Sequence, residues 1–66
     1  MNITFSVDGQ KKQMEVKNTS TLRDVLKQEK LNEETGLLKL NGNLCHPLQT
    51  LKDGDTLEFI NIIYGG

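Results

Sequence analysis

Apolar and polar residues alternate along residues 3–7, which read Ile-Thr-Phe-Ser-Val. Alternation with a period of two is typical of a half-buried β-strand. Asp8 and Gly9 follow, and an Asp-Gly pair after such a run favours a tight hairpin turn, because glycine supplies the positive φ that the turn needs. A weaker return strand then carries Met14 and Val16. We therefore expect a β-hairpin whose first strand directs three side chains inward: Ile3, Phe5 and Val7.

The spacing of apolar residues changes after residue 20, where Leu22, Val25 and Leu26 fall on one face of a helix. Thr21 and the residue three positions on, Asp24, resemble a capping box, in which each side chain bonds to the other's main-chain amide. Ser20 is the alternative cap. The pattern predicts a helix of about three turns, with Leu31 closing its apolar face just beyond the end.

The second half of the chain again predicts strands. Residues 37–40 read Leu-Leu-Lys-Leu, and the Asn41-Gly42 pair after them favours another two-residue hairpin turn. Residues 43–46 form a short return strand, which Pro47 confines to the edge of the sheet. We expect two leucines to pack beneath the following loop, Leu48 and Leu51.

The last strand is predicted over residues 56–64, directly after a turn at residues 52–55. The resulting order is two strands, one helix and then three strands. This order predicts an α+β domain in which one helix packs across one face of a small mixed sheet of four to five strands. The first and last strands are expected to be neighbours at the centre of that sheet.

Both faces of the last strand carry apolar residues near its end. A half-buried strand has one apolar face, and a single helix covers only one face of a sheet. We therefore expect the second face to be a surface for docking a partner. Its residues are Ile60, Ile62 and Tyr64.

Composition excludes several classes of protein. The 66 residues carry a net charge of −1, without the basic stripe and stacking aromatic residues that nucleic-acid binding needs. Cys45 has no second cysteine to pair with, which favours a reducing, cytoplasmic location. No stretch has the roughly 20 apolar residues of a membrane helix. We expect a protein that is a monomer when free.

No set of residues predicts catalysis or metal binding. Cys45 and His46 are neighbours on a short strand, so their side chains point to opposite faces and do not make a nucleophile–base pair. We interpret Cys45 as a small buried apolar residue and His46 as an exposed loop residue. Asp53 and Asp55 flank a glycine, a pattern more typical of a turn than of a calcium site.

The sequence closes with Gly65-Gly66 directly after the apolar strand. Glycine has no Cβ and adopts either sign of φ, so a diglycine arm enters channels that side chains would block. We expect residues 1–64 to form the domain and residues 65–66 to form a flexible tail. The alternative is a frayed end without a role.

The order of elements resembles the ThiS/MoaD-type sulfur carrier proteins, which share the ubiquitin-like β-grasp fold. The resemblance rests on Leu40-Asn41-Gly42, on the turn Leu51-Lys52-Asp53-Gly54-Asp55 and on Gly65-Gly66. The short length is closer to ThiS, the carrier of the thiamine pathway. Tyr64 departs from the pattern, because both groups often carry a small residue there.

The resemblance implies a carrier and not an enzyme. An E1-like adenylating enzyme would activate the Gly66 carboxylate with ATP, and a sulfur donor of the cysteine desulfurase or rhodanese type would convert it to a thiocarboxylate. A thiazole synthase, or another sulfur-accepting synthase, would then take the sulfur. No cofactor would be bound stably, and Gly65 would be the flexible neighbour of the modified residue.

Three alternatives remain open at this level. The chain is a ubiquitin-like modifier conjugated through Gly66, or the small subunit of a molybdopterin synthase, or an interaction module with an inert tail. Conjugates of higher mass in a cell extract, lost when Gly66 is deleted, would favour the modifier.

Overall fold

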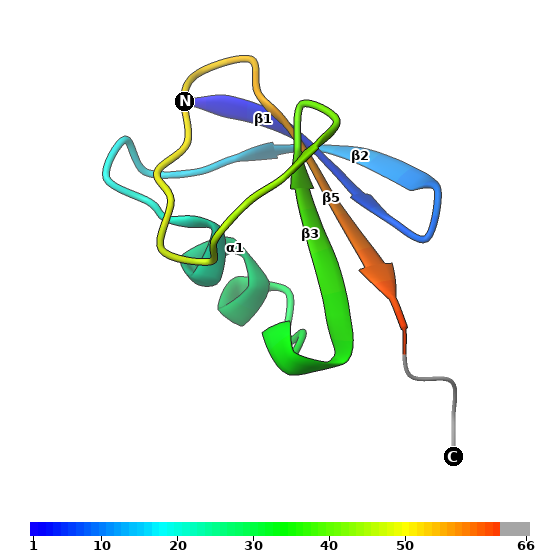
Figure 1. Cartoon of the computed structure of the whole chain (residues 1–66). Helices are drawn as coiled ribbons and strands as arrows, with labels where there is room; N and C mark the ends of the chain where they lie inside the picture. The colour runs from blue at the N-terminus through cyan, green and yellow to red at the C-terminus, as the bar shows by residue number, and fades with distance from the viewer. Residues whose placement is uncertain (63–66) are drawn as a thin grey trace.

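The computed structural model describes residues 1–62, and these residues form the strands and helices in the predicted order (Figure 1). Residues 63–66 lie outside the described part. The elements are β1 (Asn2–Val7), β2 (Gln10–Glu15), α1 (Leu22–Gln28), a short 3-10 helix η1 (Glu33–Thr35), β3 (Gly36–Leu40), β4 (Asn43–Leu44) and β5 (Thr56–Asn61).

The strands form one mixed sheet in the order β2-β1-β5-β3-β4. β1 and β5 run parallel at the centre, with Val7 opposite Phe59, while β5 and β3 are antiparallel, with Leu40 opposite Leu57. The outer strands β2 and β4 each join their neighbour through a two-residue turn. The predicted central pairing of the first and last strands is therefore confirmed.

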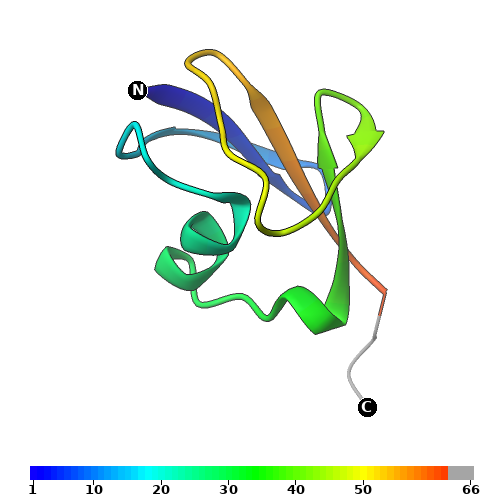
Figure 2. The ribbon, with the colours of Figure 1, turned by 60° about the vertical axis from the view of Figure 1, so that its left-hand side comes forward.

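The core lies between α1 and one face of this sheet, as the rotated view shows (Figure 2). Phe5, Leu57 and Phe59 come from the two central strands and are fully buried. Leu22, Val25 and Leu26 cover them from the helix, in agreement with the predicted apolar face. The predicted arrangement of one helix across one face of a small mixed sheet is confirmed.

Helix α1 begins as predicted and ends earlier. The Thr21 side chain accepts from the Asp24 amide and the Asp24 carboxylate accepts from the Thr21 amide, so the capping box is present and Ser20 is not the cap. The helix has seven residues, about two turns instead of three. It ends because Lys30 adopts a left-handed conformation (φ 58), and the Leu31 amide then bonds back to the Leu26 carbonyl.

Two predictions in the second half need correction. The return strand β4 spans only Asn43–Leu44, shorter than residues 43–46. Leu51 is buried as expected, whereas Leu48 is exposed. The reason is that the loop meets α1 through its main chain: the carbonyls of Pro47 and Gln49 accept hydrogen bonds from the first amides of the helix, which leaves the Leu48 side chain outside.

β5 ends at Asn61, within the predicted range of residues 56–64. The predicted domain boundary at residue 64 lies outside the described residues. In the part of the chain that is described, no helix has the length and apolar character needed to cross a membrane.

Candidate functional site

The end of β5 is held from both sides. On the β1 side, the carboxylate of Asp8 accepts hydrogen bonds from the main-chain amide of Asn61 at 2.9 Å and from the Asn61 side-chain amide at 2.6 Å. On the β3 side, the Ile62 amide donates to the Thr35 carbonyl at 3.0 Å. These bonds join Asn61 to the β1–β2 turn and Ile62 to η1.

Asp8 makes these bonds from the turn between β1 and β2. Its left-handed conformation (φ 49) is one that aspartate tolerates, and its own amide donates to the Phe59 carbonyl at 3.0 Å. The hydrogen bonds from the side chain and main chain of Asn61 lower the pKa of the Asp8 carboxyl below its ordinary value. The carboxylate therefore stays ionised at neutral pH and keeps accepting both bonds.

The sheet face opposite α1 carries apolar residues close to the end of β5. Leu37 on β3 and Ile60 on β5 are direct partners, so their side chains lie on the same face. Ile62 lies two positions beyond Ile60, and Leu44 lies on the same face, opposite Lys39 of β3. We call this group the open-face patch: Leu37, Leu44, Ile60 and Ile62.

The open-face patch includes two of the predicted docking residues. Ile60 is half-buried and Ile62 is 51% exposed, so neither is lost in the core. The other predicted site residues, Tyr64, Gly65 and Gly66, lie outside the described residues. Docking through Ile60 and Ile62 stays a prediction, and their exposure is compatible with it.

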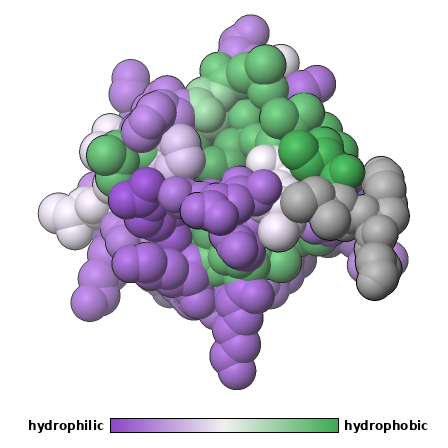
Figure 3. All heavy atoms as spheres, turned by 60° about the horizontal axis from the view of Figure 1, so that its bottom comes forward, coloured by the Kyte–Doolittle hydropathy of each residue, from purple (hydrophilic) through white to green (hydrophobic). Residues whose placement is uncertain are grey.

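Sequence reasoning missed Leu37 and Leu44, which are 41% and 68% exposed. A signal for Leu37 was available: Leu37 and Leu38 are adjacent on a strand, so only one of them can face the core. The space-filling view from below shows hydrophobic residues gathered in one region, with hydrophilic side chains over much of the remainder (Figure 3).

Cys45 and His46, which carry reactive side chains, contact other parts of the domain. Cys45 packs against the core, and partial burial raises the pKa of its thiol, so it stays protonated at neutral pH. His46 is exposed, and its Nδ1 accepts a hydrogen bond from the Leu48 amide at 3.1 Å. The interpretation of His46 is confirmed, whereas Cys45 is partly buried instead of fully buried.

Asp53 and Asp55 use their carboxylates to hold the chain. Asp53 accepts from the Asn2 amide at 2.7 Å, and Asp55 accepts from the Lys52 amide at 2.7 Å and the Asn41 side chain at 3.0 Å. The turn interpretation is therefore confirmed. Over residues 1–62, no three His, Cys, Asp or Glu side chains are grouped so as to hold a metal ion.

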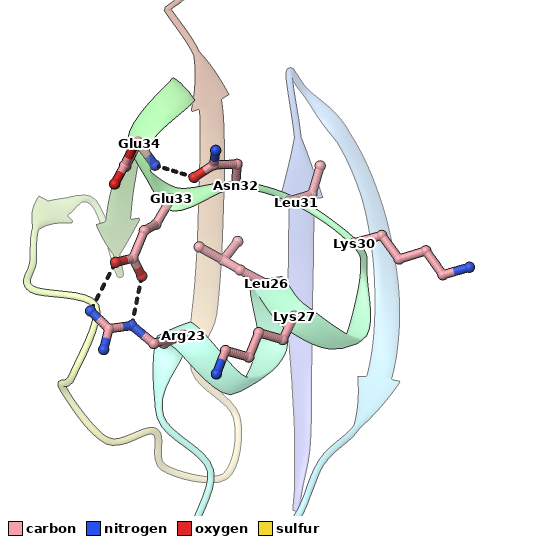
Figure 4. A pocket seen from close by; sticks show the side chains of 8 residues that line it. All are labelled: Arg23, Leu26, Lys27, Lys30, Leu31, Asn32, Glu33 and Glu34. Carbon is pink, nitrogen blue, oxygen red and sulfur yellow. Dashed lines mark hydrogen bonds and ion pairs between the residues drawn. The ribbon is translucent and has the colours of Figure 1, made fainter.

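A hollow of about 410 Å³ lies between the end of α1 and η1 (Figure 4). Arg23 crosses it and donates two hydrogen bonds of 2.8 Å to the carboxylate of Glu33. This contact raises the pKa of Arg23 and lowers the pKa of Glu33, so both groups remain ionised at neutral pH and the ion pair persists. We interpret the ion pair of Arg23 and Glu33 as a contact that holds η1 against α1.

Comparison with known proteins agrees with this arrangement. The sequence model of the ThiS family matches residues 3–66 of this chain. The match therefore covers residues 3–62 of the described domain and extends through the diglycine.

Solved structures show the same fold as the described domain. A thiamine biosynthesis protein (ThiS) from Geobacter metallireducens is 27% identical, with a TM-score of 0.68 and 100% of both chains covered. SAMP1 from Haloferax volcanii has a TM-score of 0.73 at 13% identity, again with 100% of both chains covered. A complex of subunits 1 and 2 of the molybdopterin-converting factor from Helicobacter pylori contains a chain that is 23% identical, with a TM-score of 0.68 and 100% coverage of both chains. The architecture is the ubiquitin-like β-grasp fold.

Proposed function

Because this chain belongs to the ThiS family of sulfur carriers, we propose that it carries sulfur as a thiocarboxylate on Gly66 and delivers it for the thiazole of thiamine. The observation that carries the proposal is the family match over residues 3–66, which includes the diglycine. Carriers of this family are not catalysts themselves, so the chemistry is supplied by partner enzymes.

The proposed chemistry begins at a carboxylate, which is a poor electrophile because attack on it must expel oxide or hydroxide. An E1-like enzyme overcomes this by joining the Gly66 carboxylate to the α-phosphate of ATP, which releases pyrophosphate and gives an acyl-adenylate. The persulfide of a donor of the cysteine desulfurase or rhodanese type then attacks the adenylate and displaces AMP, which gives an acyl disulfide. A cysteine thiol of a partner enzyme cleaves this bond, forms a disulfide with the donor's cysteine and releases the thiocarboxylate. Glycine suits this position because it has no side chain to hinder attack.

The domain contributes recognition in this proposal. The open-face patch lies beside the exit of β5, so a partner that covers Ile60 and Ile62 also receives the residues that follow them. Burial of exposed apolar side chains supplies the binding free energy. The same surface would serve in turn the adenylating enzyme and the sulfur-accepting synthase.

We propose a thiazole synthase as the acceptor. The ThiS family match and the 27% identity to a thiamine biosynthesis protein support this choice. The likeness to SAMP1 and to the molybdopterin-converting factor complex is at 13% and 23% identity and concerns the fold alone.

The proposal is tested by mass spectrometry of the intact protein. Incubation with a cognate E1-like enzyme, ATP and a sulfur source is expected to add about 16 Da, the difference between one sulfur and one oxygen atom. Omission of ATP serves as the control. An intact chain that forms neither the adenylate nor the thiocarboxylate with its cognate enzyme would disprove the proposal.

Replacement of Ile62 by glutamate tests the docking surface. Ile62 is 51% exposed, so Ile62→Glu is expected to change the free energy of unfolding by less than about 0.5 kcal/mol. A carboxylate buried against the partner lacks a counter-charge, so affinity for the adenylating enzyme is expected to fall roughly tenfold or more. Titration calorimetry and urea unfolding measure the two effects.

Leu48→Glu is the matched control for this substitution. Leu48 is 56% exposed and also apolar, but it lies on the loop that contacts the start of α1, away from the open-face patch. Its replacement is expected to leave the affinity unchanged. Equal losses of affinity and stability in Ile62→Glu would assign Ile62 to the core instead of to the interface.

A further inference from the structure

Two contacts at the end of β5 join segments that are far apart in the sequence. Asp8 bonds to Asn61 through both oxygens of its carboxylate, across 53 positions of the chain. The Ile62 amide bonds to the Thr35 carbonyl at the end of η1. The chain is thus bonded to β1–β2 on one side and to η1 on the other, directly before the last four residues of the sequence.

We propose that Asp8 is a positioning residue, which clamps Asn61 so that the residues beyond Ile62 leave the domain from a fixed point and in a fixed direction. This proposal rests on the proposed function, because it concerns how the tail is delivered to the adenylating enzyme. It adds a residue that neither contacts the reacting atoms nor belongs to the open-face patch.

Chain geometry explains why a fixed exit point matters. Four residues span at most about 14 Å when fully extended, so the Gly66 carboxylate has a short reach from Ile62. Without the Asp8 carboxylate, Asn61 keeps its pairing with Gly36 of β3 but loses its contacts on the β1 side, so Asn61 and Ile62 have a larger volume to search. The partner must then order these residues each time it binds the tail.

Asp8 is well suited to this clamping role. Asp8 lies in the tight turn of the β1–β2 hairpin. Its main-chain amide donates a hydrogen bond to the Phe59 carbonyl, which continues the pairing of β1 with β5. One oxygen of its carboxylate holds the main chain of Asn61 and the other holds its side chain. An ionised acceptor makes hydrogen bonds stronger than a neutral one.

Three variants isolate the contact. Asp8→Gly removes the carboxylate without backbone strain, because glycine readily adopts the φ of 49° at this position. Asp8→Asn keeps the shape and tolerates the same φ: its amide oxygen accepts from the Asn61 main chain, and its amide nitrogen donates to Asn61 once that side chain has turned. Asp55→Ala is the matched control, since Asp55 also accepts from one main-chain amide and one asparagine side chain, but before the start of β5.

The first readout is the heteronuclear ¹⁵N–¹H NOE of the Asn61 and Ile62 amides in the free protein. We expect both values to fall in Asp8→Gly and to stay at the wild-type level in Asp8→Asn and Asp55→Ala. This measurement requires no enzyme. Unchanged values in Asp8→Gly would overturn the clamp, whatever the activity of the protein.

The second readout is the adenylation of the full chain, followed by ATP–pyrophosphate exchange. Asp8→Gly is expected to raise the KM for the carrier roughly three- to tenfold, since the partner must order about one more backbone residue, while kcat stays unchanged because the bound complex is the same. Asp8→Asn should restore KM. An equal rise in KM for Asp55→Ala, or a fall in kcat alone, would contradict positioning through Asn61.

The two readouts separate this proposal from the proposed function. If the wild-type chain is not adenylated at all, the sulfur-carrier proposal fails, and the NOE measurement still decides whether Asp8 clamps the end of β5. If the wild-type chain is adenylated and Asp8→Gly matches it in both NOE and KM, only the positioning role of Asp8 fails.

Discussion

Deletion of Gly66 is expected to abolish the mass gain of about 16 Da while leaving the domain folded. The shortened chain ends on Gly65, which also carries a carboxylate, but its end lies about 3.5 Å short of the wild-type position. The exit of β5 is fixed by Asn61 and Ile62, so the domain does not shift to restore this reach. Intact mass after incubation with the adenylating enzyme, ATP and a sulfur source measures the effect.

The control for this deletion is the stability of the shortened chain. Each side chain in the described core lies between Ile3 and Phe59, so the free energy of unfolding is expected to change by less than about 0.5 kcal/mol. Gly66→Ala separates the effect of tail length from the effect of a side chain in the partner's channel, because it restores the length and adds a Cβ at the reacting residue. A deletion variant that still gained sulfur would show that the modification does not require the carboxylate to stand at the position of Gly66.

Replacement of Gly36 by alanine is expected to destabilise the domain by about 2–3 kcal/mol. A Cβ at this position would lie 2.6 Å from Cε1 of the Phe59 ring and 2.8 Å from the Ile60 carbonyl oxygen. The Phe59 ring is fully buried, so it has no free space to enter. A domain of this size has a total stability of roughly 3–10 kcal/mol, so the loss is a large fraction of it. Urea unfolding measures the change.

A double-mutant cycle with Phe59→Leu tests this explanation. Leucine lacks the outer ring atoms that a Cβ on residue 36 would meet, so part of the clash should disappear. The double variant is expected to be more stable than the sum of the two single effects predicts. If the two changes in free energy of unfolding are strictly additive, the Phe59 ring is not the group that excludes a Cβ at residue 36. The Ile60 carbonyl would then be the cause.

Local chemistry explains which parts of the fold could be predicted. The turns at Asp8-Gly9 and Asn41-Gly42 were predicted because the type I′ turn of a two-residue hairpin needs positive φ at both positions, and all four residues have it. The start of α1 was predicted because Thr21 and Asp24 are spaced as a capping box. In each case the residues that determine the geometry are neighbours in the sequence.

The end of α1 and the position of Leu48 depend on contacts that the sequence does not display. Lys30 adopts the left-handed conformation at which glycine is the usual signal, so the helix was predicted one turn too long. Leu48 reads as a core leucine, but the neighbouring carbonyls bond to the helix and leave its side chain outside. Propensity and hydrophobicity do not encode these main-chain contacts.

The candidate site divides in the same way. Ile60 and Ile62 were identified by alternation, because a strand that is apolar on both faces exceeds what one helix can cover. Leu44 was missed because it is exposed only since β4 is an edge strand of two residues. The contact between Asp8 and Asn61 joins a hairpin turn to the last strand, and a single sequence carries no signal for it.

The central position of β5 has a consequence for synthesis on the ribosome. The residues of the β1–β2 and β3–β4 hairpins are translated before β5, which is the strand that joins the two hairpins in the sheet. Until then Leu57 and Phe59 are absent, and the inner edges of β1 and β3 have no partner. Such dependence on distant contacts slows folding. A nascent chain interrupted before β5 would therefore remain open to proteolysis, and the domain closes only when the strand that leads into the diglycine is in place.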